Sequence, residues 1–237
     1  MHQAIDPAIL YFGTPVLLIT TQNEDGSSNI APMSSAWWLG WSCMLGLEAS
    51  SQTTRNLRRT GECVLNLPSD ELVGQVDKLA LLTGRMAVPP HKRRLGYQYC
   101  SDKFSAAGFT PQPAECVRAA RILECPIQLE AKLVAAHPFA RADERMAVPA
   151  LALEVQIVRA HVREALLDEH KRHRIDPDRW RPLIMSFRKF YGLQSCEQSS
   201  RLAQGSESAY APWRGGFARR VLARAYRRWA EHAYADE

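Results

Sequence analysis

The sequence predicts a mainly β protein whose strands form an antiparallel barrel that is closed or nearly closed. Short apolar runs recur along the chain, and the pair Asp25-Gly26 marks a hairpin turn between two of them. Strands and helices do not alternate, and no G-x-G-x-x-G motif follows a strand. These two features disfavour a doubly wound nucleotide-binding fold, whereas many short strands with covered edges favour a barrel.

The individual elements follow from apolar patterns that end at turn or capping residues. The expected strands span residues 16–21, 29–38, 42–48, 62–67, 127–134 and 151–162. Along 127–134 every second residue is apolar, so Gln128, Glu130 and Lys132 share the other face. The expected helices span residues 53–60, 70–82 and 178–190, and the second of them starts from a cap at Ser69 or Asp70.

Length and composition describe an ordinary globular protein. The chain has 237 residues, of which 46% are hydrophobic and 23% are charged, and its formal net charge is +5. This length suffices for one sizeable domain, with or without an appendage. A modest positive charge suits an anionic small molecule as well as it suits nucleic acid. We expect a small-molecule ligand and no nucleic-acid partner.

Cysteine usage and apolar runs indicate the compartment. None of the six cysteines belongs to a C-x-x-C pair, which favours buried free thiols in a reducing compartment. The N-terminus lacks a basic region followed by a long apolar core, and no run of about 18 apolar residues occurs. We therefore expect a cytoplasmic protein with no transmembrane segment.

One histidine pair has a spacing found in metal sites. His170 and His173 form an H-x-x-H motif, but they lie among charged residues and without a cluster of cysteines or carboxylates. A solvated loop is the favoured interpretation, and we expect no metal site.

The strand after the Asp25-Gly26 turn has an unusual composition. A returning strand should alternate large apolar and polar residues, but here the residues are small, polar or unable to donate a ladder hydrogen bond. They include Asn29, Ala31, Pro32, Ser34 and Ser35. Small side chains of this kind leave a low surface along the strand, which suggests that a flat group lies against it.

A second stretch, residues 47–67, has the chemistry of a phosphate site. After Glu48 the chain offers hydroxyl groups at Ser50, Ser51 and Thr53, and a short helix containing Arg55 then begins. Hydroxyls, free backbone N–H groups at a helix start and a guanidinium together can hold a phosphate. The alternative is a capped helix with a solvated arginine face. Together with the low strand surface, this stretch predicts a ligand similar to a mononucleotide.

Five motifs in a fixed order resemble the flavin reductase-like family. They are Asn29-Ile-Ala-Pro-Met-Ser34 after the turn, Thr53-Thr-Arg-Asn56, Gly61-Glu-Cys-Val-Leu-Asn-Leu67, Lys103-Phe-Ser-Ala-Ala-Gly-Phe-Thr110 and Glu124-Cys-Pro-Ile-Gln-Leu-Glu130. Each motif alone is weak, but the series covers roughly residues 10–192 and is specific. The resemblance implies the FMN-binding split barrel, an antiparallel Greek-key β-barrel that flavoredoxin-type proteins also adopt.

The resemblance further implies a homodimer with FMN bound near the subunit interface. The residues that it implies for cofactor binding are Asn29, Ala31, Pro32, Met33, Ser34, Ser35, Ser50, Ser51, Thr53 and Arg55. Residues 31–35 would lie along the isoalloxazine ring, and the residues from Ser50 onward would hold the phosphate. Lys103 and Thr110 match motif positions without an assigned contact. No catalytic residue is assigned, because the flavin itself carries the hydride chemistry.

The resemblance implies an FMN-dependent oxidoreductase, most simply an NAD(P)H-dependent flavin reductase that supplies reduced flavin to a redox partner protein. An FMN-binding electron carrier or flavin sensor without direct NAD(P)H activity is the alternative, because the sequence has no dedicated nicotinamide motif. A split barrel that has lost flavin and binds another anion or haem is a third reading, because fold alone does not fix function.

The remaining expectations concern the C-terminal part and three flanking segments. We expect residues 1–193 to form the split barrel, and 194–237 to form a polar linker and an extra C-terminal helix that is basic and amphipathic. That helix would dock on its own dimer, with an acidic partner, RNA or an anionic membrane as alternatives. His91 and Lys92 would lie in an exposed linker or close over a ligand. Trp37, Trp38 and Trp41 would pack in the core or dimer, or line the flavin site.

Overall fold

The computed structural model describes residues 1–143, 146, 148–171, 173–193, 221 and 225. The chain divides into two compact units, Met1–Ser195 and Cys196–Glu237. The predicted linker and basic C-terminal helix at 194–237 lie outside the described residues, apart from the isolated positions 221 and 225. The fold described below is that of the first unit.

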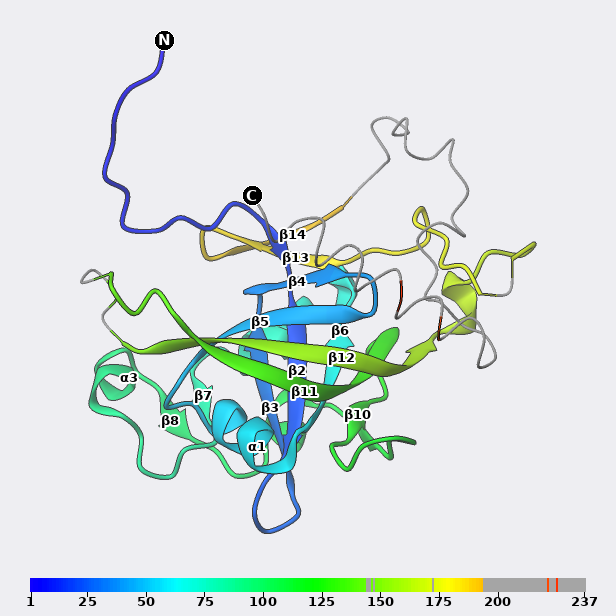
Figure 1. Cartoon of the computed structure of the whole chain (residues 1–237), viewed down its shortest axis with the longest axis horizontal. Helices are drawn as coiled ribbons and strands as arrows, with labels where there is room; N and C mark the ends of the chain where they lie inside the picture. Colours follow the sequence, from blue (N-terminus) through cyan, green and yellow to red (C-terminus); the bar gives the residue numbers. More distant parts are fainter. Residues whose placement is uncertain (144–145, 147, 172, 194–220, 222–224, 226–237) are drawn as a thin grey trace. The chain divides into compact units, whose positions relative to one another are not determined.

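A seven-stranded antiparallel sheet forms the body of this unit. In spatial order its strands are β3 (Ser28–Met33), β2 (Leu17–Gln22), β6 (Glu62–Leu67), β11 (Ile127–Phe139), β12 (Ala150–Val162), β5 (Ser42–Glu48) and β4 (Ala36–Leu39). Strands β11, β12 and β5 cross the direction of β2 and β3, so the sheet curls strongly (Figure 1). The predicted mainly β fold with an antiparallel split barrel is therefore confirmed.

Two residues close this barrel. Strands β3 and β4 lie at opposite edges of the sheet, yet only Ser34 and Ser35 separate them in the chain. So short a connection spans only about 10 Å, and the two edges must therefore approach each other. Ser35 fixes this corner, because its carbonyl accepts from the Gly46 N–H at 2.7 Å and its hydroxyl donates to the Gly46 carbonyl at 2.7 Å. The predicted strand 29–38 is thus two strands, β3 and β4.

Short elements surround the sheet. The helices are α1 (Gln52–Thr60), η1 (Asp70–Leu72), α2 (Val73–Lys78), α3 (Pro90–Arg94), α4 (Lys103–Ala107) and η2 (Glu164–Leu166). The further strands are β1 (Thr14–Pro15), β7 (Leu82–Thr83), β8 (Gln98–Tyr99), β9 (Pro111–Gln112), β10 (Arg121–Ile122), β13 (Leu183–Ser186) and β14 (Lys189–Gly192). Strands β1, β13 and β14 form a second, three-stranded antiparallel sheet.

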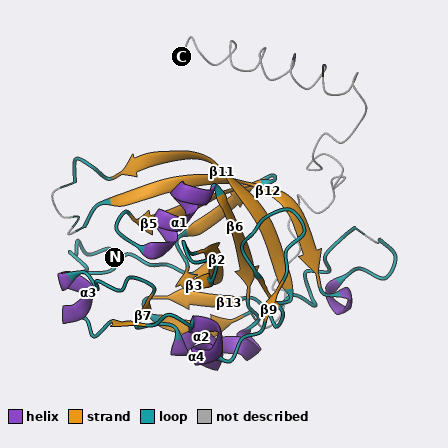
Figure 2. Ribbon diagram, turned by 90° about the horizontal axis from the view of Figure 1, so that it is seen from below, coloured by secondary structure: helices purple, strands orange, loops and turns teal. Residues whose placement is uncertain are grey.

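The apolar run that leads into β2 is buried on both faces. Leu17 and Ile19 belong to the core inside the barrel, which also contains Leu57 of α1. Val16 and Leu18 belong to a second core, formed with α2 and α4. Figure 2 shows α1 on one side of β2 and β3, and α2 and α4 on the other. The alternation of a strand explains this split, because successive side chains point to opposite faces.

The predicted helix at 178–190 is wrong, because this segment forms the β13–β14 hairpin. The Arg181 carbonyl accepts from the Asp70 N–H at 3.1 Å, and the Leu183 carbonyl accepts from the Val16 N–H at 2.8 Å. In a helix these carbonyls would accept from residues four positions further along the chain. Phe187 and Arg188 have positive φ values of 46° and 65°, as the tight turns of hairpins require. Distant backbone partners thus override the local apolar pattern.

The predicted helix at 70–82 is shorter than expected. Its first turn is the 3₁₀ helix η1, α2 ends at Lys78, and Leu82 already belongs to β7. Ser69 makes no side-chain capping bond and instead bridges to Pro182. The other predicted elements are confirmed to within two residues at each end, except that β11 extends five residues beyond 134.

The polar face of β11 is covered by protein. The carboxylate of Glu130 is fully buried, and it accepts the backbone N–H groups of Glu115 at 2.9 Å and Val117 at 3.2 Å. His161 Nε2 lies 2.7 Å from the same carboxylate. Burial raises the pKa of Glu130, but these hydrogen bonds outweigh it, and the net pKa is lowered. The alternating pattern therefore separates two buried environments as far as Ala131, whereas Lys132 on the polar face is exposed.

The described cysteines are free thiols. Cys43, Cys63 and Cys125 are buried, as predicted, whereas Cys100 and Cys116 are half-buried. Burial raises the pKa of the Cys43 thiol to about 12. Within the described part of the chain, no helix is long and apolar enough to span a membrane.

The barrel core yields a first prediction. Leu45 of β5 is 0% exposed, whereas Leu123, which follows β10, is 51% exposed. Replacing Leu45 by alanine leaves a cavity among close-packed side chains, and we expect it to lower the free energy of unfolding by about 2–5 kcal/mol. Leu123→Ala, the matched control, should change it by less than about 1 kcal/mol. Urea denaturation of both variants measures the difference, and equal effects would contradict this barrel interior.

Candidate functional site

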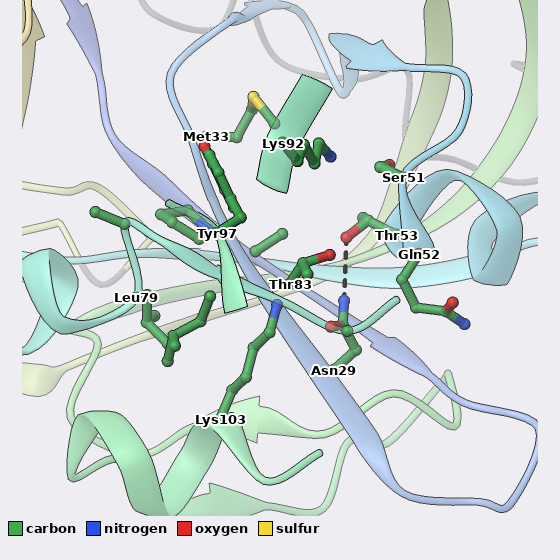
Figure 3. A pocket seen from close by; sticks show the side chains of 15 residues that line it. Asn29, Met33, Ser51, Gln52, Thr53, Leu79, Thr83, Lys92, Tyr97 and Lys103 are labelled. Carbon is green, nitrogen blue, oxygen red and sulfur yellow. Dashed lines mark hydrogen bonds between the residues drawn. The ribbon is translucent and has the colours of Figure 1, made fainter. Parts of the chain in front are cut away.

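A pocket lies beside β3 and is enclosed by segments that are distant in sequence. We call it the central pocket. Its lining comprises Asn29, Ala31, Pro32, Met33, Ser51, Gln52, Thr53, Leu79, Ala80, Leu82, Thr83, Gly84, Lys92, Tyr97 and Lys103. These residues come from β3, the start of α1, the end of α2, β7, α3 and α4, and their side chains converge as Figure 3 shows. The pocket is narrow, with a volume of about 100 Å³.

Strand β3 exposes its free edge to this pocket. Among the described residues its only partner in the sheet is β2, with Leu18 opposite Pro32 and Thr20 opposite Ile30. Proline lacks an N–H group and is tolerated where no ladder bond is needed, as on the outer side of an edge strand. The carbonyl of Ile30 points to the same outer side, because it accepts a hydrogen bond from Lys103 Nζ at 2.8 Å. The small residues of β3 therefore leave an open strip of backbone.

Lys103 places a buried amine at this strip. Its side chain extends from α4 toward Asn29 and Thr83 in the pocket (Figure 3), and the residue is only 3% exposed. Burial, together with a smaller effect of the neighbouring charge of Lys92, lowers the pKa of Lys103 to about 8. Among the described residues no carboxylate lies within ion-pair distance of this amine. A buried amine without a counter-ion favours an anionic ligand.

The start of α1 forms a second polar wall. Ser51 caps the helix, because its hydroxyl accepts the Thr54 N–H at 3.1 Å. Thr53 accepts a hydrogen bond from Asn29 Nδ2 at 3.1 Å, which ties α1 to β3. The first helical turn closes with the Arg55 N–H bound to the Ser51 carbonyl. The backbone N–H groups of Gln52 and Thr53 precede that turn and lack intrahelical partners. Such groups attract anions.

Helix α3 covers the pocket from the opposite side. Lys92 is half-buried and forms an ion pair with Glu48 at 2.9 Å, and its amine lies 5.8 Å from the ring centre of Tyr97. His91 Nε2 lies 3.3 Å from the other oxygen of Glu48. Burial raises the pKa of Glu48, but its bonds to Ser50 and Lys92 outweigh this effect and leave the pKa lowered. The expected exposed linker at His91 and Lys92 is therefore wrong, and α3 is held over the pocket.

The structure brings together six of the ten residues proposed for cofactor binding. Asn29, Ala31, Pro32, Met33, Ser51 and Thr53 line the central pocket. Ser34 and Ser50 do not line it: the Ser34 hydroxyl lies 2.8 Å from the Tyr11 hydroxyl, and the Ser50 hydroxyl donates to Glu48. Ser35 forms the barrel corner described above. Arg55 lines an adjacent hollow and lies 3.7 Å from Glu24.

Several pocket residues were not predicted as site residues. They are Gln52, Leu79, Ala80, Leu82, Thr83, Gly84, Lys92, Tyr97 and Lys103. Lys103 stands in a recognised motif, which is a signal for its importance but not for its contact. The residues from Leu79 to Tyr97 carry no motif, and only the fold brings them to β3.

The tryptophans and the H-x-x-H histidines discussed above lie against the core or at the surface. Trp38 and Trp41 pack against the barrel core, whereas Trp37 is exposed on the edge strand β4. His170 and His173 are exposed, as expected for a solvated loop. Within the described part of the chain, no group of three His, Cys, Asp or Glu residues is placed to hold a metal ion.

Comparison with known proteins gives a consistent family relationship. Residues 9–194 match the family described as "Flavin reductase like domain". Over 190 residues the chain is 40% identical to the "Uncharacterized protein YdfE" of Bacillus subtilis (strain 168), and the match covers 80% of this chain and 88% of that protein.

Solved structures with low sequence identity share the fold. Flavoredoxin of Desulfovibrio vulgaris (Miyazaki F) matches with a TM-score of 0.68 and 22% identity, covering 86% of this chain and 100% of that chain. Nitrilotriacetate monooxygenase component B from Bacillus cereus matches with a TM-score of 0.65 and 19% identity, covering 84% and 99%. At these identities the similarity shows a common fold.

The contact between Gly84 and Asn29 yields a second prediction. A Cβ atom at Gly84 would lie 2.4 Å from Asn29 Oδ1 and 3.2 Å from Gln52 Cγ. Gly84→Ala should therefore displace Asn29 from Thr53 and lower the free energy of unfolding by about 1–3 kcal/mol. Gly74→Ala is the matched control, because a Cβ atom there meets nothing within 4 Å and alanine favours the helix. Thermal denaturation compares the two, and an unchanged stability in Gly84→Ala would refute this close approach.

Proposed function

The chain belongs to the flavin reductase-like family, and from this premise we propose that the central pocket binds FMN and that the protein is an NAD(P)H-dependent flavin reductase. The family and its flavoredoxin and flavin reductase neighbours support a flavin-related oxidoreductase. The observation that carries the finer proposal is the buried, positively charged Lys103 beside the flat strip of β3. An anionic planar ligand complements both features.

The donor groups of the pocket fit FMN. Ala31, Pro32 and Met33 offer a low surface for a planar ring. The N–H groups of Gln52 and Thr53, together with the Ser51 hydroxyl, offer donors to a phosphate. A flavin ring is larger than the volume of about 100 Å³, so we expect α3 to move outward when the ligand binds. The ion pairs of His91 and Lys92 with Glu48 would have to break or be exchanged in this movement.

The residues of the pocket would bind FMN, orient it and tune its reduction potential, whereas FMN when bound supplies the hydride chemistry. Lys103 would stabilise additional negative charge near its amine, because a buried cation interacts strongly with an anion. Asn29 would hold the start of α1 against β3 through Thr53. Tyr97 and Leu79 would exclude water from the ring. No acid or base is needed among these roles.

We also propose that the protein is a cytoplasmic homodimer that passes electrons to a redox partner protein. Trp37 and Leu39 support a partner surface, because both are exposed apolar side chains on the edge strand β4. Exposed apolar residues on an edge strand are typical of surfaces that another chain covers.

The proposed activity predicts a defined spectral experiment. Purified protein should be yellow or should take up FMN, and anaerobic addition of NADH or NADPH should bleach the flavin absorbance. Rapid bleaching supports a reductase. Binding of FMN without bleaching by either nucleotide would contradict NAD(P)H dependence and would favour the electron carrier or sensor. A colourless protein that does not bind added FMN would contradict flavin binding altogether.

Lys103 predicts a pH dependence of flavin affinity. An anion favours the protonated amine, so the pKa of Lys103 should rise above about 8 when FMN binds. The affinity should therefore be constant below about pH 8 and fall as the pH rises further, because binding then requires uptake of a proton. Lys103→Met should bind FMN roughly tenfold to a hundredfold more weakly at pH 7 and lose this pH dependence.

Fluorescence titration with FMN between pH 7 and pH 9.5 measures both effects. Lys132→Met is the control, because Lys132 is an exposed lysine of β11. A wild-type affinity that is flat over this range, or a parallel decline in Lys103→Met, would remove Lys103 from the binding site.

A further inference from the structure

The segment 81–99 forms one wall of the central pocket, and we call it the outer wall. It comprises β7, α3 and β8, which lie on one flank of the barrel (Figure 1). Lys92 and Tyr97 face inward and line the pocket. The parallel pairing of β7 with β8 holds the segment together, because the Leu81 carbonyl accepts from the Gln98 N–H at 2.9 Å. The other side of the segment is therefore an ordered surface directly outside the proposed flavin site.

The outer wall exposes large apolar and aromatic side chains. Leu81, Met86, Leu95 and Tyr99 are 50%, 78%, 68% and 42% exposed. The Leu81 side chain lies beside the turn that follows Leu95, because a Cβ atom at Gly96 would be 3.9 Å from Leu81 Cδ1. Met86 and Tyr99 line the same hollow next to the central pocket. Apolar side chains that gather in one segment, in contrast to scattered ones, mark an interaction surface.

The same segment is strongly basic. Residues 79–101 include no aspartate or glutamate, but they contain Arg85, His91, Lys92, Arg93 and Arg94. Lys92 is paired with Glu48. Arg93 and Arg94 are exposed, and in the described part of the chain no carboxylate lies within ion-pair distance of either. Unpaired guanidinium groups beside exposed apolar side chains complement an acidic protein surface that also carries apolar residues.

We propose that the outer wall is the docking surface for the redox partner protein, and that this partner presents carboxylates around an apolar contact. The inference rests on the proposed function, because it identifies where the electron acceptor would bind. A partner docked there lies against the segment that covers the proposed flavin. The electrons of the reduced flavin would pass to the acceptor group of the partner, which is reduced as the flavin is oxidised, and the flavin protons would leave to solvent.

Two other occupants fit this surface less well. A two-fold contact centred on the patch would bring it against its own copy, so that Arg93 and Arg94 would face like charges. Trp37 and Leu39 on β4 offer the homodimer an exposed surface without this repulsion. A nucleic acid would pair with the arginines, but its polar backbone would leave Leu95 without an apolar partner. An acidic protein satisfies both kinds of side chain.

A pair of amphipathic peptides tests the surface with the full chain. One labelled peptide is built from glutamate and leucine, and the other has lysine in place of each glutamate. Fluorescence anisotropy should show that the Glu/Leu peptide binds about tenfold or more tightly than the Lys/Leu peptide, and that added salt reduces the difference. Equal affinities for the two peptides, or no binding of the Glu/Leu peptide, would overturn the proposal.

Substitutions on the outer wall separate its charge from its apolar contacts. The double change Arg93→Glu with Arg94→Glu should weaken binding of the Glu/Leu peptide by about tenfold or more, and Leu95→Ala should weaken it by about tenfold. Arg188→Glu with Lys189→Glu is the matched control, because it makes the same change in net charge at exposed positions of the β13–β14 hairpin. The control should keep the wild-type affinity. An equal loss in both double variants would reduce the effect to net charge and contradict a defined surface.

Two further measurements identify the occupant. Sedimentation velocity should give the wild type and the Arg93→Glu, Arg94→Glu variant the same oligomeric state. Dissociation of a homodimer in this variant would assign the outer wall to the self-contact, and tighter binding of a DNA duplex than of the Glu/Leu peptide would assign it to nucleic acid; either result would overturn the proposal. The peptides bind without flavin, so a failure to bind FMN together with intact peptide binding would contradict the proposed function alone.

Discussion

The burial of β2 on both faces is the constraint on which the rest of this structure depends. Because Leu17 and Ile19 complete the barrel core and Val16 and Leu18 complete the outer core, β2 must lie inside the molecule. Its hairpin partner β3 then forms the edge of the sheet, and only two residues lead on to β4 at the opposite edge. The open strip beside β3 is a direct consequence of this arrangement.

The electrostatics of the site follow from what covers that strip. The outer core positions α4, so that Lys103 reaches the Ile30 carbonyl from within the protein. The other cation, Lys92, is neutralised by Glu48, which leaves the positive charge of Lys103 for a ligand. The anion-binding character that we propose for the pocket therefore arises from packing, because the positions of the two lysines are fixed by apolar contacts and by one carboxylate.

Most of the barrel could be predicted from the sequence, because its strands are locally encoded by apolar runs between turns. Only part of the site could be predicted from the sequence. Asn29 and Thr53 stand in motifs and do meet, but Ser34 and Ser35 proved to belong to a chain connection whose closeness depends on the opposite edge of the sheet. The segment with Lys92 lacks any motif. The prediction of a helix at 178–190 was wrong for the same reason, because β13 pairs with β1, which lies about 170 residues away in sequence.

We propose that a flavin lies against β3 while the start of α1 holds its phosphate. A crystal structure of the protein with excess FMN tests it most directly. We expect the ring beside Ala31, Pro32 and Met33, the phosphate within hydrogen-bond distance of the Gln52 and Thr53 N–H groups, and α3 displaced outward. FMN bound elsewhere, or an empty pocket still closed by Lys92 and Tyr97, would contradict the account.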